Sequence, residues 1–401
     1  MRKLAGPLLG KYLIQNRAAN LFIKITDAVL ALCLSFPKRK FEISRSPRRI
    51  LLANSAHMGD VLIMTSILPV LKEAFPDTEI GVLIGSWSLP IVKNLSEIER
   101  IHIVDHWKLN RANIPFRRKF QIFWKTRSAA LKEIKATGYD VAIDLYCHFP
   151  NFIPLLWQAR VPVRIGYTSG GFGPMLTHPR VWLNLDQHVS AYHSNLLQTL
   201  HIDKSRCREL HYKLSSSNIE PGVDVLEKTA ADSSDYIVVH MGTGEAKREW
   251  PLSKWKVLSQ ELSEKGYSLV FTGIGTKEAE NASKVSGGLL HSVNVCGKLS
   301  WDDFLSVIKK ARLVICVESL AGHIAAAMDT DCVAIWSGMA NHHHWRPLSA
   351  SARVLLNPVP CAPCYRSRGC TTMDCVRDLQ PQKVLSAVLE KLSVQSQLEG
   401  C

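Results

Sequence analysis

The chain has 401 residues, of which 46% are hydrophobic and 21% charged, so it is unlike disordered proteins and long enough for two domains. Lysine and arginine outnumber aspartate and glutamate by 49 to 35, which gives a formal charge of +14. Residues 1–50 alone hold eleven basic and two acidic side chains. A uniformly basic coat for nucleic acid is therefore excluded.

Residues 1–48 are predicted to form a basic amphipathic segment on an anionic membrane surface. Apolar residues recur at helical spacing between Leu9 and Leu32, with Lys11, Arg17 and Lys24 among them. The alternative is packing against the protein's own surface. The apolar run at 28–36 is far shorter than the roughly 20 residues that a membrane span needs, and no small-residue cleavage site follows it. We expect a cytoplasmic protein, peripheral on the inner membrane.

From residue 49 onward, short apolar runs alternate with helical stretches, which predicts parallel sheets built from βαβ units. The first series has strands at 50–54, 79–84, 100–105 and 139–145 and helices at 61–74, 128–135 and 188–200, with a glycine-rich loop starting at 164. The second has strands at 236–240, 268–272, 313–317 and 332–336 and helices at 253–265, 277–285, 301–310, 320–328 and 383–392. We therefore predict two Rossmann-like α/β domains, 49–202 and 235–401, joined by a polar linker at 203–234 and facing a cleft.

Several turns that follow these strands carry reactive side chains, at the sheet edge where open α/β proteins bind ligands. Asp60 begins the first helix, either as an acid stabilised by the helix dipole or as a general base. Thr243, Gly244 and Lys247 follow the strand at 236–240, in either a phosphate cradle or a plain connection. The cradle would not be a Walker loop, because that motif is absent.

Two further turns of the second domain carry an acid. Glu278 opens a helix, either as a capping acid or as an acceptor for ribose hydroxyls. Glu318 and Ser319 follow the strand at 313–317, and His323 lies one turn into the next helix, where a histidine is often simply buried. Together these groups suit a nucleotide-linked donor held by the second domain, with chemistry at the cleft.

At this point the sequence resembles the lipopolysaccharide heptosyltransferases, glycosyltransferase family 9, over residues 49–392. The motifs that carry the resemblance are Met58-Gly59-Asp60-Val61, the series His240…Thr243…Lys247…Trp250-Pro251, and the segment from Glu318 to Ala327. The resemblance implies a GT-B fold and inverting transfer of heptose from ADP-heptose to a lipopolysaccharide core. It also implies Asp60 as catalytic base, a donor site at Thr243, Gly244, Lys247, Glu278, Glu318, Ser319, Gly322 and His323, no catalytic metal, and no cofactor.

The sequence departs from the family pattern in one place. The usual segment is Asp-(Ser/Thr)-Gly-Pro-x-His, whereas this chain has Glu318 for the aspartate and Leu320-Ala321 for the Gly-Pro pair. A longer carboxylate and a bulky leucine would reshape the sugar pocket, so the donor sugar stays open. Phosphate binding by Lys247 is less affected.

A basic and aromatic cluster lies at residues 110–127 of the first domain. The resemblance implies that it binds an acidic glycolipid acceptor, through Arg117, Arg118 and Lys119. A solvated basic helix is the alternative, and nucleic-acid binding through the aromatic rings is a third reading that we do not favour.

Cys361, Cys364, Cys370 and Cys375 have a spacing that could hold structural zinc or, less readily, an iron–sulfur centre, but reduced thiols are the favoured interpretation. The run His342-His343-His344 is expected in a loop. We expect a monomer. Two competing functions remain open: a nonenzymatic module that binds membrane or nucleic acid, and a nucleotide-sugar epimerase of the same fold. Binding of ADP that depends on Lys247 would separate an enzyme from the nonenzymatic module.

Overall fold

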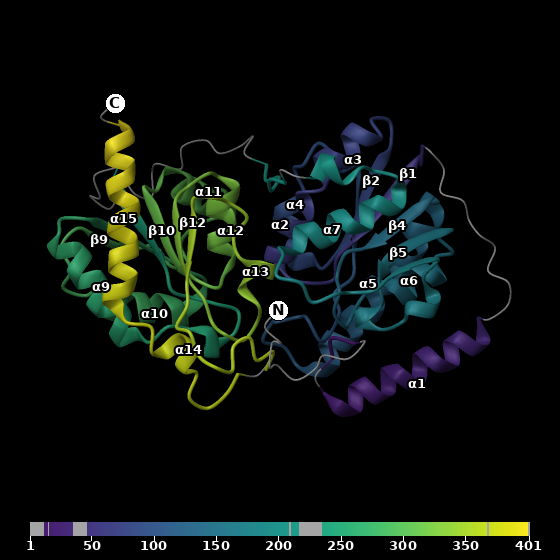
Figure 1. Ribbon diagram of the computed structural model, residues 1–401, viewed down its shortest axis with the longest axis horizontal. Helices are drawn as coiled ribbons and strands as arrows, with labels where there is room; N and C mark the ends of the chain where they lie inside the picture. Colours follow the sequence, from purple (N-terminus) through teal and green to yellow (C-terminus); the bar gives the residue numbers. More distant parts are fainter. Residues whose placement is uncertain are drawn as a thin grey trace. The chain divides into compact units, whose positions relative to one another are not determined.

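The computed structural model describes residues 12–14, 16–34, 46–207, 210–215, 235–366 and 369–399. These residues fall into two compact units, one within 7–215 and one within 216–401 (Figure 1). Each unit contains one six-stranded sheet in which every strand pair is parallel. The prediction of two doubly wound α/β domains is therefore confirmed. Of the expected linker, residues 208–209 and 216–234 lie outside the described residues.

The sheet of the first unit has the strand order β3-β2-β1-β4-β5-β6. Its central strands are buried on both faces, as expected for a parallel sheet covered by helices on both sides. The strands are β1 (Arg49–Ala53), β2 (Glu79–Ile84), β3 (Arg100–Ile103), β4 (Val141–Asp144), β5 (Val163–Tyr167) and β6 (His178–Arg180).

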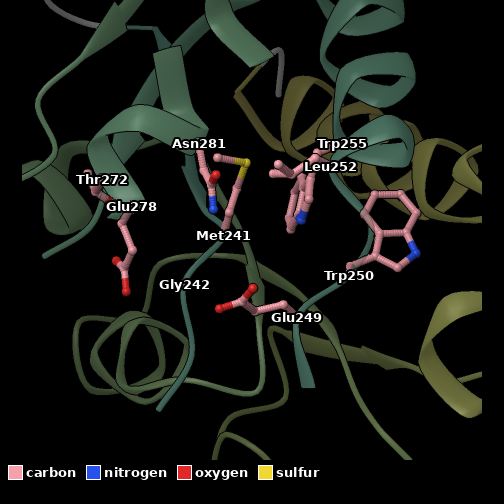
Figure 2. A pocket seen from close by; sticks show the side chains of 9 residues that line it. All are labelled: Met241, Gly242, Glu249, Trp250, Leu252, Trp255, Thr272, Glu278 and Asn281. Atoms are coloured by element: carbon pink, nitrogen blue, oxygen red, sulfur yellow. The ribbon is translucent and has the colours of Figure 1, made fainter. Parts of the chain in front are cut away.

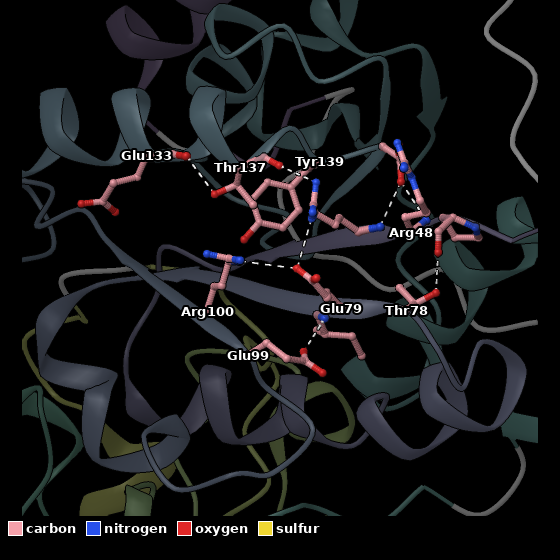
Figure 3. Close-up of polar contacts among 12 residues, drawn as sticks. Arg48, Thr78, Glu79, Glu99, Arg100, Glu133, Thr137 and Tyr139 are labelled. Carbon is pink, nitrogen blue, oxygen red and sulfur yellow. Dashed lines mark hydrogen bonds and ion pairs between the residues drawn. The ribbon is translucent and has the colours of Figure 1, made fainter.

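Ion pairs fasten the amino-terminal edge of this sheet. Arg49 Nε lies 3.1 Å from Glu79 Oε2. Arg100 Nε approaches the same oxygen at 3.5 Å, and Figure 3 shows Arg100 and Glu79 facing each other. Arg49 also donates to the carbonyl oxygen of Thr137 at 2.9 Å. These contacts join three adjacent strands at the edge opposite the carboxyl ends, which is where open α/β proteins bind ligands. The carboxyl edge is left to loops that carry polar and charged side chains.

Two predicted helices of this unit have different bounds, and two short ones, Leu89–Val92 and Ile153–Gln158, were not predicted. The helix expected at 61–74 is two helices, and Pro69 in the first turn of the second explains the break, since proline cannot continue a preceding helix. The helix expected at 128–135 runs over 22 residues. The helices are α1 (Arg17–Cys33), α2 (Met58–Thr65), α3 (Leu68–Ala74), α4 (Leu89–Val92), α5 (Phe116–Thr137), α6 (Ile153–Gln158) and α7 (Val189–Leu197).

Helix α1 is attached to the first unit by few side chains. Asp27 is buried and accepts hydrogen bonds from the Tyr12 hydroxyl at 2.8 Å and from the Phe172 N–H at 2.7 Å. Ile23 packs onto Gly171, where a Cβ would come 2.5 Å from the isoleucine. The rest of the basic segment 1–48 lies partly outside the described residues, namely 1–11, 15 and 35–45. In the described part of the chain, no helix is long and apolar enough to cross a membrane.

The sheet of the second unit has the order β12-β11-β10-β7-β8-β9. Strands β7 and β10 are buried at every residue, which is the continuous apolar run that their sequences predict. The strands are β7 (Tyr236–His240), β8 (Ser268–Thr272), β9 (Ser292–Asn294), β10 (Leu313–Val317), β11 (Cys332–Ile335) and β12 (Ala352–Leu355). The helices are α9 (Leu252–Glu264), α10 (Gly275–Ser286), α11 (Trp301–Lys310), α12 (Leu320–Ala327), α13 (His342–Trp345), α14 (Asp374–Arg377) and α15 (Pro381–Glu399).

Three of the four strands that sequence patterns missed lie at the edge of a sheet. Strands β6, β9 and β12 have three or four residues, and no residue of β6 or β9 is fully buried, so they lack the apolar run that identifies inner strands. Strand β5 was expected to begin a loop but pairs with β4 over four residues. The histidine run at 342–344, expected in a loop, forms most of α13.

Candidate functional site

Asp60 lies in the first turn of α2, directly after the carboxyl end of β1. The turn is held by Asn54, whose side chain accepts from the Ala56 N–H at 3.0 Å and donates to the Asp60 carbonyl at 3.3 Å. The indole of Trp87 donates to the Ala56 carbonyl at 2.8 Å. The loop is therefore held from two sides. Asp60 is half-buried at the sheet edge where open α/β proteins bind ligands.

Groups at the end of β4 share the surroundings of Asp60. Burial raises the pKa of Tyr146 and of Cys147, and the negative charge of Asp60 adds to the effect. Burial raises the pKa of Asp144 to about 7, although the N–H groups of Tyr146 and Phe152 donate to its carboxylate. Through these two bonds the Asp144 carboxylate holds the loop that follows β4. Sequence reasoning predicted a strand at 139–145 and assigned no role at the site to Asp144 or to the two residues that follow the strand.

The predicted acceptor residues occupy the first turns of α5. Arg117 and Arg118 are exposed, whereas the Lys119 ammonium donates to the Asn110 carbonyl at 2.8 Å. Pro115 precedes the helix without a side-chain cap, and no acid lies in the first turn. Three cations at the positive end of a helix dipole are unfavourable for the isolated helix and attract anions.

In the second unit, the loop after β7 carries Thr243, Gly244 and Lys247. The Thr243 hydroxyl donates to the Glu318 carbonyl at 3.1 Å, so this loop is bonded to the loop after β10. Gly244 is exposed. The Lys247 ammonium donates to the Cys370 carbonyl at 3.3 Å rather than to any group of the β7 or β10 loops.

Glu278 lies where a ribose-binding acid is expected, at the carboxyl ends of β7 and β8. Its carboxylate accepts from the Ile274 N–H at 2.8 Å. A Cβ on Gly242 would lie 2.3 Å from this carboxyl group, so a side chain at 242 would displace it. Burial raises the pKa of Glu278, and the nearby charge of Glu249 adds to the effect.

A pocket opens beside Glu278, with about 330 Å³ of empty space that includes open solvent. Figure 2 shows Glu278 and Glu249 on either side of the Gly242 backbone. The inner wall is aromatic, with Trp250 and Trp255 edge to face at 5.1 Å. The Trp255 indole N–H is buried and has no hydrogen-bond partner among the described residues. The pocket is thus lined by two carboxylates, Glu249 and Glu278, which can accept hydrogen bonds, and by the Trp255 indole, whose N–H is an unused donor.

Glu318 forms a partly buried polar cluster with Arg248, a residue that sequence reasoning overlooked. Arg248 Nη1 donates to Glu318 Oε1 at 2.5 Å, and the Ser337 hydroxyl donates to Oε2 at 2.9 Å. Burial raises the pKa of Glu318, while Arg248 and Ser337 act in the opposite direction. Both carboxylate oxygens are therefore already bonded to protein. Glu318 is better suited to holding Arg248 than to contacting a sugar.

Two donors of this cluster are unused. Arg248 Nε and the Ser319 hydroxyl are buried without a hydrogen-bond partner in the described part of the chain. Ser319 is the N-cap residue of α12 yet makes no capping bond. Buried unpaired donors are costly, and an anion bound at this helix end would satisfy both.

The two other predicted residues of α12 are packed into the unit. A Cβ on Gly322 would lie 3.1 Å from Cys316 Sγ and 3.2 Å from Pro347, so the glycine permits close packing. Burial lowers the pKa of His323 to about 4, which makes this imidazole neutral near pH 7.

The cysteine segment contacts the loops that follow β7 and β11. The Cys364 N–H donates to the Gly338 carbonyl at 3.0 Å, in the loop that follows β11. Cys370 Sγ accepts from the Met373 N–H at 3.3 Å, and this bond is the main reason that its pKa is lowered. Burial raises the pKa of Cys375. Among the described residues, no group of three or more histidine, cysteine or acidic side chains is arranged to hold a metal ion.

The family model of glycosyltransferase family 9 (heptosyltransferase) matches residues 127–373, more than half of the chain. The chain belongs to glycosyltransferase family 9. It is 23% identical over 340 residues to lipopolysaccharide heptosyltransferase 1 of Pseudomonas aeruginosa, an alignment that covers 80% of this chain and 87% of the relative.

Solved structures extend the comparison to the fold. A family 9 glycosyl transferase from Veillonella parvula superposes with a TM-score of 0.71 at 20% identity, covering 86% of this chain and 97% of that one. E. coli heptosyltransferase WaaC with ADP gives 0.64 at 18% identity, covering 86% and 99%. These likenesses confirm the predicted GT-B fold. Family membership identifies a glycosyltransferase and disfavours the nonenzymatic module.

Proposed function

We propose that this glycosyltransferase moves heptose from ADP-heptose to the acidic core of a lipopolysaccharide or a related envelope glycolipid, with inversion at the anomeric carbon. The observation that carries the proposal is the Thr243–Arg248–Glu318 cluster, with its unused donors, in a member of this family. The Pseudomonas aeruginosa relative is a lipopolysaccharide heptosyltransferase, and the E. coli heptosyltransferase WaaC was solved with ADP.

In this proposal the second unit holds the donor. Glu278 accepts hydrogen bonds from the ribose hydroxyls, since its carboxylate is held beside Gly242 by a backbone N–H. Arg248, Ser319 and the start of α12 bind the diphosphate, with Thr243 and Lys247 alongside. Gly244, Gly322 and His323 shape the surrounding loops.

Asp60 of the first unit is the proposed general base. It takes the proton of the acceptor hydroxyl while that oxygen forms a bond to the anomeric carbon. The bond from this carbon to the diphosphate oxygen breaks, and its electron pair leaves with ADP. Arg248 and Ser319 stabilise the charge that develops on the departing diphosphate.

A transfer assay tests the proposed reaction directly. The full chain is incubated with ADP-heptose and heptose-deficient lipopolysaccharide, and mass spectrometry should show an acceptor heavier by one heptose residue. ADP-glucose and a UDP-sugar serve as alternative donors. Transfer from one of these but not from ADP-heptose would correct the donor, and NMR of the new linkage would reveal whether the anomeric configuration is inverted.

The acceptor side is proposed to involve Arg117, Arg118 and Lys119, which would bind carboxylates or phosphates of the glycolipid core. We expect Arg117→Gln combined with Arg118→Gln to raise the KM for the acceptor about ten-fold or more, with the KM for the donor within two-fold. Steady-state kinetics with each substrate varied in turn measures both constants. An equal rise in both would contradict an acceptor role.

We also propose that α1 holds the enzyme, as a monomer, on the anionic cytoplasmic face of the inner membrane. Support comes from its outward stripe, in which Phe22, Ile25, Val29 and Leu32 are each more than half exposed. Arg17 and Lys24 are also exposed on this helix, while its single acid, Asp27, is buried. A basic helix with an apolar outer face is suited to an anionic lipid surface.

A further inference from the structure

Helix α5 carries an aromatic surface for which the sugar-transfer chemistry has no use. Phe116, Phe120 and Trp124 follow one another at intervals of four residues and are 62%, 41% and 48% exposed. Trp107 extends the row, with its ring 5.3 Å from that of Phe116. The rings of Phe116 and Phe120 lie 6.1 Å apart, and those of Phe120 and Trp124 6.0 Å apart. We call these four residues the aromatic ladder.

The ladder continues a side of α5 that is buried farther along the helix. Ala130 and Ile134 are buried in the core of the first unit, and Phe123 packs partly against that core. Helical periodicity puts Phe116 on the same side of α5 as Ile134. Ile134 is buried in the core, whereas Phe116 is left exposed by the described residues. The N-terminal turns therefore reach beyond the core with their apolar side exposed. Contiguous exposed apolar surface of this kind marks an interaction site.

The charges around the ladder indicate the kind of partner. Residues 116–130 contain five basic side chains and no acidic one. Arg117, Arg118 and Lys125 are exposed, and the Arg127 guanidinium lies 5.5 Å from the Trp124 ring centroid. Aromatic residues interleaved with arginine and lysine are the composition that binds the interface of an anionic bilayer.

Two observations favour lipid over nucleic acid as the partner. The ladder rings pack against one another edge to face or stacked, which occupies faces that bases would need for stacking. The same unit also carries α1, a second helix with an exposed apolar stripe and basic residues. Both helices contact α6. Arg127 of α5 donates to Gln158 of α6 at 2.7 Å, and Leu30 of α1 packs on the apolar cluster that contains Ile153 of α6.

We propose that the aromatic ladder of α5 is a lipid-binding surface, which inserts into the headgroup region of an anionic bilayer beside the glycolipid acceptor. Arg117 and Arg118 then bind anionic headgroups next to the inserted rings. The inserted ladder thus holds the acceptor-binding end of α5 at the membrane surface, where the sugar core of the glycolipid acceptor leaves the bilayer. This inference builds on the proposed glycolipid acceptor but predicts membrane binding that needs no donor.

The test measures binding of the full chain to phosphatidylglycerol-containing vesicles by cosedimentation. We expect Phe120→Ser combined with Trp124→Ser to lower the partition coefficient about ten-fold or more. Leu290→Ser, at an apolar residue of the second unit that is even more exposed, should change it less than two-fold. Arg117→Gln with Arg118→Gln should lower binding roughly five-fold per arginine on anionic vesicles, but little on phosphatidylcholine vesicles. Thermal unfolding verifies that each variant is folded.

A conservative variant separates insertion from a structural effect. Trp124→Phe should retain vesicle binding but lose part of the blue shift in tryptophan emission that vesicles cause. Normal vesicle binding by the Phe120/Trp124 serine variant would overturn the inference. The inference would also be overturned if this variant bound vesicles normally but lost binding to a single-stranded oligonucleotide. A changed oligomeric state with normal vesicle binding would overturn it as well. Sugar transfer is scored separately, so a chain that binds vesicles but transfers nothing contradicts the proposed function alone.

Discussion

Replacement of Asp60 by asparagine should lower kcat about 100-fold to 10,000-fold, because a general base typically contributes that factor and asparagine cannot accept the proton. The affinity for ADP should stay within two-fold of the unchanged protein, because the donor is assigned to the other unit. The measurement is steady-state transfer to the glycolipid, with ADP binding followed by calorimetry.

The size and shape of Asp60 are conserved in this variant, so the loop after β1 should persist. The free energy of unfolding of the variant should fall by no more than about 1 kcal/mol, because the interaction between the carboxylate and the helix dipole is lost. Asp77→Asn, at an exposed site of the same unit, is the matched control and should leave turnover unchanged. Near-normal turnover by Asp60→Asn would remove the residue from the mechanism.

The second large effect is expected at Arg248. Arg248→Ala should weaken ADP binding about 10-fold to 100-fold, since hydrogen bonds from a charged donor to phosphate are worth roughly 1.5–3 kcal/mol. Adenosine, which has no phosphate, should bind the variant and the unchanged protein alike. Arg248→Lys should recover only part of the loss, because lysine lacks the planar pair of donors. Calorimetry with ADP, AMP and adenosine gives the comparison.

Arg248→Ala also leaves the buried Glu318 carboxylate without its cation, which can destabilise the unit by several kcal/mol. The double variant Arg248→Ala/Glu318→Ala removes both charges and should recover stability without recovering ADP affinity. Arg353→Ala, at an exposed ion pair of the same unit, controls for loss of a basic side chain. Recovery of tight ADP binding in the double variant would show that Arg248 acts only by supporting the fold.

The choice between Lys247 and Arg248 illustrates what pattern reasoning lacks. Both are cations in the same loop, and the sequence favoured the lysine through its family resemblance. The short 3₁₀ turn at Ala246–Arg248 separates their directions, so that Lys247 reaches Cys370, 123 residues along the chain, and Arg248 reaches Glu318, 70 residues along. Contacts at such separations have no local signature. The part played by Glu318 in holding Arg248 follows from the same two contacts.

The sequence by itself determined the architecture and the position of the reactive loops. Buried parallel strands such as β7 and β10 are continuous apolar runs, and their ends are marked by glycine, hydroxyl and acidic residues, so local patterns suffice. The tertiary structure decided which of those residues meet. It also revealed that the first turns of α5 extend beyond the core, because burial depends on what the remaining chain covers. The basic and aromatic residues of this stretch are visible in the sequence, but their exposure as an aromatic ladder is known only from the structure.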